Sequence, residues 1–168
     1  MSNVIFAQKM VTRTGAVKFE ASTPLESIAA VNNAASCILN KDNGELAALV
    51  LIKGFQFKSP LMQEHFNENY MESSKYPKAT FKGKILNFDA SKLTAQKNSY
   101  DLEGELMIHG VSKKVKTKIS LSLNNGKIDA TGSFNARPQD YNIEIPRLVK
   151  DKIAETAKID YSFVLEAK

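Results

Sequence analysis

The chain has 168 residues and a mass of 18.6 kDa, the size of one ordinary domain. Hydrophobic residues make up 43% and charged residues 24%, the mix of a folded globular protein rather than a disordered one. No apolar run approaches the roughly 20 residues of a membrane-spanning helix. The net charge of +5 is modest and the basic residues are scattered, so nothing here points to nucleic-acid binding. A single cysteine, Cys37, excludes an internal disulfide and a cysteine-rich zinc site.

Residues 1–14 are expected to form an N-terminal segment, followed by one domain over residues 15–168. Val4–Ala7 is a short apolar stretch that ends in alanine and is followed by a polar residue, as in the last part of an export signal. Two interpretations stay open. The stretch is either what remains of a trimmed signal, with native cleavage after Ala7, or a short strand at the terminus.

Most of the chain alternates apolar and polar residues with period two, which predicts half-buried strands. The clearest alternating stretches are Val17–Glu20, Phe81–Ile85, Leu102–His109, Val115–Leu123, Ile128–Phe134 and Ile159–Glu166. Leu46–Phe57 is apolar on both parities at first, which predicts a strand covered on both sides. Gly110–Lys113 is expected to turn. Asn124-Asn125-Gly126 predicts a hairpin, because Asn and Gly accept the positive φ of tight turns.

Helical patterns are few. The clearest covers Pro60–Glu72, where Ser59 can cap the helix and proline suits the first turn. Its i, i+4 spacing gathers on one face Met62, Phe66 and Tyr70, with His65 and Asn69 beside them. Weaker helical patterns cover Pro24–Asn33 and Lys150–Ala157.

Seven or eight strands with short connections predict an all-β protein, and a closed antiparallel barrel is favoured because it leaves no exposed strand edge. The residues predicted to point inward are uneven in size. The small ones are Gly83, Gly104, Thr117, Ala130 and Gly132. Such residues either taper a filled barrel or leave a cavity for a small apolar ligand.

The candidate site is therefore the inward-facing apolar set. Its members are Phe55, Phe57, Met62, Phe66, Phe81, Ile85, Leu106, Ile108, Ile119, Phe134, Tyr161 and Phe163. Periodicity alone favours plain core packing for this set, since every small β protein needs one.

Polar candidates are scarce. His65, on the helix face, is either a satisfied structural histidine or a hydrogen-bonding partner for a ligand head group. His109, beside a turn on the outward parity, is expected to make a structural hydrogen bond. Arg137 and Asp140 form either a short ion pair or a polar gate. The basic row Lys114, Lys116 and Lys118 is either a solvated face or a contact for anionic lipid head groups.

Catalytic and metal-binding patterns are missing from the sequence. Because the chain has only two histidines, it cannot form a three-histidine metal site, and it has no HExxH motif. There is no G-x-S-x-G motif and no phosphate-binding glycine loop. We therefore expect that the protein is not an enzyme and that it uses no cofactor or metal ion.

Three segments, in this order, resemble the YceI-like family of bacterial lipid-binding proteins. They are FKSPLMQEHFNENYMESSKYPKATFKGKI (Phe57–Ile85), LEGELMIHGVSKKVK (Leu102–Lys116) and NARPQDYNI (Asn135–Ile143). The likeness runs from about Gly15 to the C-terminus.

The resemblance implies a lipocalin-like antiparallel barrel of about eight strands, with the helix near its open end. It also implies that the inward set, with His65, Arg137 and Asp140, lines a tunnel for a polyisoprenoid, a quinone-like tail or a similar lipid. Family members are typically exported, which implies a periplasmic or secreted protein. We expect it to store or transport lipid, either as a monomer or as a homodimer. An anionic membrane surface is a further expected partner.

Two departures from the family pattern bear on the head-group contact. The family's early His-Ser pair is replaced by Arg13-Thr14, and Asn142 stands where glycine is common. Two other hypotheses remain: a solid-cored interaction or stress-response module that acts through its surface, and an enzyme acting on a lipid.

Overall fold

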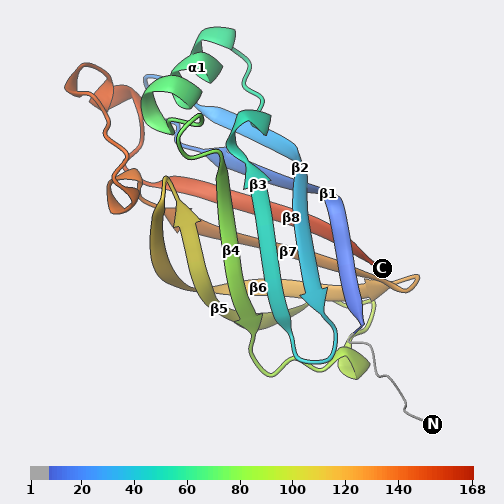
Figure 1. Cartoon of the computed structure of the whole chain (residues 1–168). Coiled ribbons are helices and arrows are strands. Elements are labelled where there is room, and N and C mark those ends of the chain that lie inside the picture. The colour runs from blue at the N-terminus through green and yellow to red at the C-terminus, as the bar shows by residue number, and fades with distance from the viewer. Residues whose placement is uncertain (1–7) are drawn as a thin grey trace.

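The computed structural model describes residues 8–168, which fold into a closed antiparallel barrel of eight strands (Figure 1). The strands are β1 (Lys9–Glu20), β2 (Ala29–Asn40), β3 (Glu45–Leu51), β4 (Lys78–Ile85), β5 (Asn98–Ile108), β6 (Val111–Asn124), β7 (Lys127–Ala136) and β8 (Ala157–Ala167). Each strand pairs with the next in the chain, and β8 pairs back onto β1. This confirms the predicted fold class, in which closure leaves no free edge.

The barrel begins earlier than the expected boundary at residue 15. Lys9 is already paired with Asn40 of β2, and Met10 with Ala167 of β8. Val4–Ala7, the expected signal remnant, lies outside the described residues.

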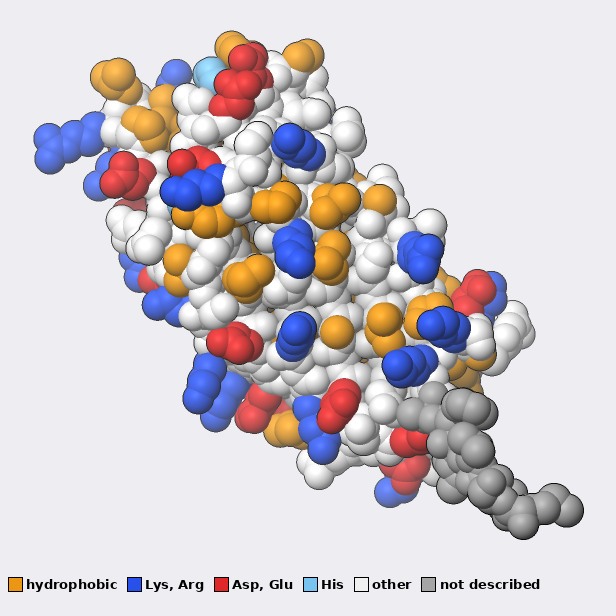
Figure 2. Space-filling model, in the orientation of Figure 1, with side chains coloured by type: hydrophobic (Ala, Val, Ile, Leu, Met, Phe, Trp, Pro, Cys, Tyr) orange, Lys and Arg blue, Asp and Glu red, His pale blue; other side chains and the backbone are white. Residues whose placement is uncertain are grey.

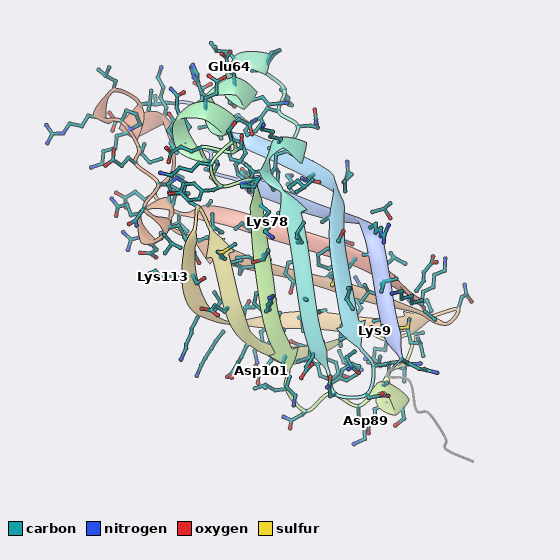
Figure 3. All side chains as sticks on the ribbon, viewed as in Figure 1. Lys9, Glu64, Lys78, Asp89, Asp101 and Lys113 are labelled. Carbon is teal, nitrogen blue, oxygen red and sulfur yellow. The ribbon has the colours of Figure 1, made fainter. Side chains whose placement is uncertain are left out.

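The connections between strands alternate between the two ends of the barrel, and the helical unit lies at one of them (Figures 1 and 3). The end near Glu64 carries the β1–β2, β3–β4, β5–β6 and β7–β8 connections, and we call it the open end. The end near Lys9 and Asp89 carries the β2–β3, β4–β5 and β6–β7 connections, and we call it the closed end.

The hairpin predicted at Asn124-Asn125-Gly126 is confirmed. Asn125 and Gly126 have φ values of 52° and 79°, and Asn124 pairs with Lys127, as in a two-residue turn of the primed type. The turn expected at Gly110–Lys113 begins one residue earlier, at His109, and β6 already starts at Val111.

The predicted helix forms, but it changes from α-helical to π-helical hydrogen bonding along its length. α1 (Pro60–His65) begins with the Ser59 hydroxyl accepting a hydrogen bond from the Met62 N–H, as expected for an N-cap. A π-helical turn, η2 (Phe66–Tyr70), then replaces the expected α-helix, and the Met71 N–H donates to the Phe66 carbonyl at 2.8 Å. This helical unit lies across the open end (Figure 1).

The helix predicted at Pro24–Asn33 is wrong, because strand pairing overrides its weak helical period. Ala29 pairs with Glu20 and Asn32 with Val17, so the second half of the segment belongs to β2. The weaker pattern at Lys150–Ala157 is also displaced. A 3-10 helix, η5, covers Arg147–Lys152, and β8 begins at Ala157.

The segment Leu46–Phe57 is not a strand covered on both sides. β3 ends at Leu51, whose side chain is 57% exposed, and η1 (Ile52–Gly54) follows. Ala47 and Leu51 are apolar yet face solvent, because a single-walled barrel has no second layer over its outer surface.

The closed end of the barrel is packed solid. Six side chains there are at most 2% exposed: Met10, Leu39, Ile85, Leu121, Ile128 and Leu165. They come from the closed-end halves of six strands and form a plug. The fold is completed by two further 3-10 helices, η3 (Ala90–Lys92) and η4 (Pro138–Tyr141). Within residues 8–168, no helix is long and apolar enough to cross a bilayer.

Candidate lipid-binding cavity

Above the plug the barrel is hollow. A cavity of about 540 Å³ extends from Leu46 and Leu102 to the connections at the open end. Its walls come from all eight strands and are overwhelmingly apolar. The volume lies within the range of about 300–1,000 Å³ that is usual for small-molecule sites. The side chains that point into the barrel therefore form a packed core at the closed end and line a cavity towards the open end.

The structure places most of the predicted site residues around this cavity. Those that line it are Phe55, Phe57, Met62, His65, Phe66, Phe81, Leu106, Ile108, Phe134, Arg137, Tyr161 and Phe163. The other three lie elsewhere. Ile85 and Ile119 are buried in the packed core, and Asp140 is an exposed residue of η4. Most of the predicted inward-facing residues thus line the cavity, whereas Ile85 and Ile119 belong to the packed core.

Three aromatic rings lie flat against the wall because glycines beneath them leave room. The Tyr161 ring lies over Gly132, and the Phe163 ring over Gly15, where the pairing of β1 is interrupted by a bulge. Phe81 covers Gly83 on its own strand and Gly104 on β5, which is paired with Gly83. A side chain at any of these glycines would meet the ring. The glycines therefore widen the lumen.

Four phenylalanines close part of the open end. Phe66 stacks on Phe19 with ring centroids 5.2 Å apart, and its centroid lies 4.9 Å from that of Phe57 and 5.8 Å from that of Phe55. We call Phe19, Phe55, Phe57 and Phe66 the aromatic cluster. It fastens the π-helical turn to β1 and to the segment after β3, so the helical unit is held over the cavity by apolar contacts.

The acidic and basic side chains that line the cavity lie towards the mouth. They are Glu26 from the β1–β2 connection, His65 from the β3–β4 connection, and Arg137 and Lys152 from the β7–β8 connection. The expected Arg137–Asp140 ion pair does not form. The Arg137 guanidinium instead donates to the Gln139 side chain at 3.2 Å. Arg137 therefore remains at the mouth, where a polar head group would emerge.

Tyr161 carries a buried hydroxyl in the cavity wall. Its oxygen is buried and has no hydrogen-bonding partner among the described residues. Burial raises the pKa of Tyr161, and the nearby Cys37 raises it further. The hydroxyl is therefore neutral at all ordinary pH values, and the interior holds no ionised group there.

His109 is buried, although its parity predicted an outward position, and it joins three connections at the open end. Its Nδ1 lies 3.0 Å from the Tyr141 carbonyl and its Nε2 lies 2.6 Å from a Glu72 carboxylate oxygen. Tyr76 packs on the ring at a centroid distance of 4.4 Å. His109 therefore makes structural hydrogen bonds, as expected.

Sequence reasoning missed one wall of the cavity. The β7–β8 connection contributes Tyr141, Ile143, Ile145, Val149 and Ile153. The first three alternate with Asn142 and Glu144, so a period-two signal was present in a segment without strand structure. Asn142 itself has φ of 55°, a left-handed conformation that asparagine tolerates better than most residues. This explains how it can stand at a position where glycine is common.

Residues 8–168 contain no group of three or more histidine, cysteine, aspartate or glutamate side chains placed to hold a metal ion. The barrel contains an apolar cavity with polar side chains at its mouth, an arrangement suited to binding a lipid chain.

Fold and cavity together define a lipocalin-like barrel with an apolar interior. The YceI-like domain matches residues 5–165, and the chain belongs to this family. No curated protein sequence matches the chain significantly.

Solved structures share the fold at low sequence identity. A polyisoprenoid-binding domain from Saccharophagus degradans is 16% identical, with a TM-score of 0.81 over 98% of this chain and 100% of that one. BcnA from Burkholderia cenocepacia is 14% identical, with a TM-score of 0.75 over 90% and 95% of the two chains. The Campylobacter jejuni YCEI protein is 15% identical, with a TM-score of 0.58 over 80% of each chain.

Proposed function

We propose that the protein binds one long apolar lipid, a polyisoprenoid or a quinone-like molecule, inside the barrel and without covalent chemistry. The observation that carries the proposal is the apolar cavity of about 540 Å³ above the plug. The family and the polyisoprenoid-binding neighbour from Saccharophagus degradans support the class of ligand.

Burial of the chain supplies the affinity. Each methylene taken from water contributes about 0.8 kcal/mol, so ten of them contribute roughly 8 kcal/mol before the cost of ordering the ligand. The plug sets the depth to which a chain can enter. The polar end stays at the mouth, near Arg137 and His65, because no charged group lies deeper.

The role we assign is storage or transport of this lipid in the periplasm or outside the cell, with no catalytic step. Such a role requires an apolar site that holds the lipid and releases it intact, and the apolar lining of the cavity supports the first requirement. Fractionation of cells that express the native gene tests the location. Recovery in the cytoplasmic fraction alone would contradict it.

Native mass spectrometry followed by organic extraction tests the binding. We expect one lipid per chain, and its mass identifies the class. The Thr117→Phe variant places a ring in the lumen and should lose the lipid. Lys116→Phe is the matched control, because Lys116 is the next residue of the same strand and its side chain is 84% exposed on the outer face.

The opposite outcome has a clear meaning. If the wild-type chain is bare, and if added polyprenols and quinones neither bind nor raise the melting temperature, the cavity does not hold lipid. The alternative of a module acting through its surface would then stand.

A further inference from the structure

Large apolar side chains are exposed around the mouth of the cavity. Leu25 in the β1–β2 connection is 67% exposed, Leu61 in α1 is 59% exposed, and Leu148 in η5 is 96% exposed. They come from the three long connections at the open end, and Leu61 also lines the cavity. We call these three leucines the leucine rim.

The most exposed of them lies in a basic setting. Leu148 follows Arg147 and precedes Lys150 and Lys152, and all three cationic residues are exposed. Only one carboxylate, Asp151, interrupts them. The β7–β8 connection that carries them projects beyond the barrel, and hydrophobic and basic side chains lie next to each other there (Figures 1 and 2).

We propose that the leucine rim and the basic tip Arg147–Lys152 dock the open end onto a bilayer that contains anionic phospholipid. The leucines enter the interface between head groups and acyl chains, and the cations bind phosphates. The mouth then opens onto the phase in which an apolar lipid resides. This step rests on the proposed function, since it gives the lipid a route that avoids water.

The basic row expected to serve this purpose is a poorer candidate. Lys116 lies 3.7 Å from Glu103, and Lys118 forms an ion pair with Asp101. Lys114 is paired across the strands with Glu105. Each lysine of the row thus faces a carboxylate on β5, which cancels much of its attraction for phosphate. The row also lies on the barrel wall, whereas the leucine rim surrounds the mouth.

Vesicle flotation with the purified full chain tests the proposal. The vesicles are phosphatidylcholine alone and phosphatidylcholine mixed with phosphatidylglycerol. We expect the wild type to float with the mixed vesicles. Leu148→Asp should lower the bound fraction on both kinds, and Lys150→Glu should lower it about fivefold on the mixed vesicles only. Ile38→Asp is the control, because Ile38 is 46% exposed on the barrel wall towards the closed end.

Four results would overturn the docking surface. The wild type could fail to float with either vesicle, Leu148→Asp could float like the wild type, or Ile38→Asp could lose as much binding as Leu148→Asp. A change from dimer to monomer in Leu148→Asp, measured by native mass spectrometry, would assign the rim to a second copy of the chain and also overturn it.

Farnesol binding in vesicle-free solution separates this proposal from the proposed function. Leu148 and Lys150 do not line the cavity, so both variants should bind farnesol like the wild type. If the wild type binds farnesol but does not float, the docking surface fails alone. If the wild type floats but binds neither farnesol nor longer isoprenoids, the lipid-carrying function fails.

Discussion

The hydroxyl of Tyr161 on β8 occupies the space that a side chain at Gly132 on β7 would need. The two residues are directly paired across the strands. Because Gly132 has no Cβ, the tyrosine ring lies against the barrel wall, and its centroid is 5.5 Å from that of Phe163. The width of the lumen is therefore set in part by wall positions that have no side chain, such as Gly132.

Gly132→Ala should push the Tyr161 ring into the cavity. We expect a loss of about 1–3 kcal/mol in the free energy of unfolding, as is usual for overpacking, and a shorter maximum length of bound polyprenol. Thermal melting and a chain-length series measure these. The control is Ser133→Ala, the next residue, which is exposed on the outer face.

A second-site change makes the prediction specific. Replacing Tyr161 with valine in the Gly132→Ala background should restore the chain length, because the displaced ring is gone. If Gly132→Ala leaves both stability and chain length unchanged, the wall accommodates the methyl group and the glycine does not set the calibre.

Phe66→Ala should weaken the attachment of the helical unit to the barrel. The ring contacts the three other members of the aromatic cluster. Since it is only partly buried, the cost should be below the roughly 3–5 kcal/mol of a fully buried phenylalanine. We also expect faster dissociation of bound lipid, measured by transfer to acceptor vesicles.

The matched control for Phe66 is Glu64→Ala. Glu64 is exposed and lies on the same helical unit at the open end (Figure 3). If both variants release lipid at the wild-type rate, the aromatic cluster does not gate the cavity.

The sequence predicted which residues point inward, because a barrel wall has only two faces and period two separates them. It could not separate the plug from the cavity. Phe81 and Ile85 share a strand and a parity, yet Phe81 lines the cavity and Ile85 is buried in the plug. The difference is their position along the barrel axis, which depends on strand register and on the volume contributed by distant strands.

The contribution of the β7–β8 connection to the cavity could not be predicted from strand periodicity, for a different reason. Ile143, Ile145 and Ile153 line the cavity from a segment that is mostly irregular, where no backbone period fixes the direction of a side chain. Similarly, the pairing of Ala29 with Glu20 decided that a weakly helical segment becomes a strand.

His109→Ala should destabilise the open end. The variant leaves the buried Tyr141 carbonyl without its imidazole donor and frees the Glu72 carboxylate. Loss of a buried hydrogen-bonding partner typically costs about 1–3 kcal/mol. Urea unfolding measures the change. Hydrogen exchange should show weaker protection in the connections around Glu72 and Tyr141.

His65→Ala is the control for His109, because His65 is exposed and should change stability by less than about 0.5 kcal/mol. An equal effect of the two histidine substitutions would contradict the role assigned to His109.

Cys37 should be inert in the folded protein. Its side chain is fully buried, and burial raises the pKa of the thiol to about 12. The unfolded thiol ionises near its ordinary value of about 8.5, so the folded state holds a proton that the unfolded state releases. The contribution of this group to stability is therefore complete below about pH 8 and is lost progressively as the pH rises towards 12.

Labelling with a thiol reagent between pH 7 and 9 measures this accessibility. In the native protein we expect a slow rate that follows the opening of the barrel, and in urea a fast rate that rises with thiolate concentration. Bound lipid should slow the native rate further, because it stabilises the closed barrel. Cys37→Ser removes the signal and supplies the blank. Rapid native labelling at pH 7 would show that β2 opens readily, which the packing around Cys37 argues against.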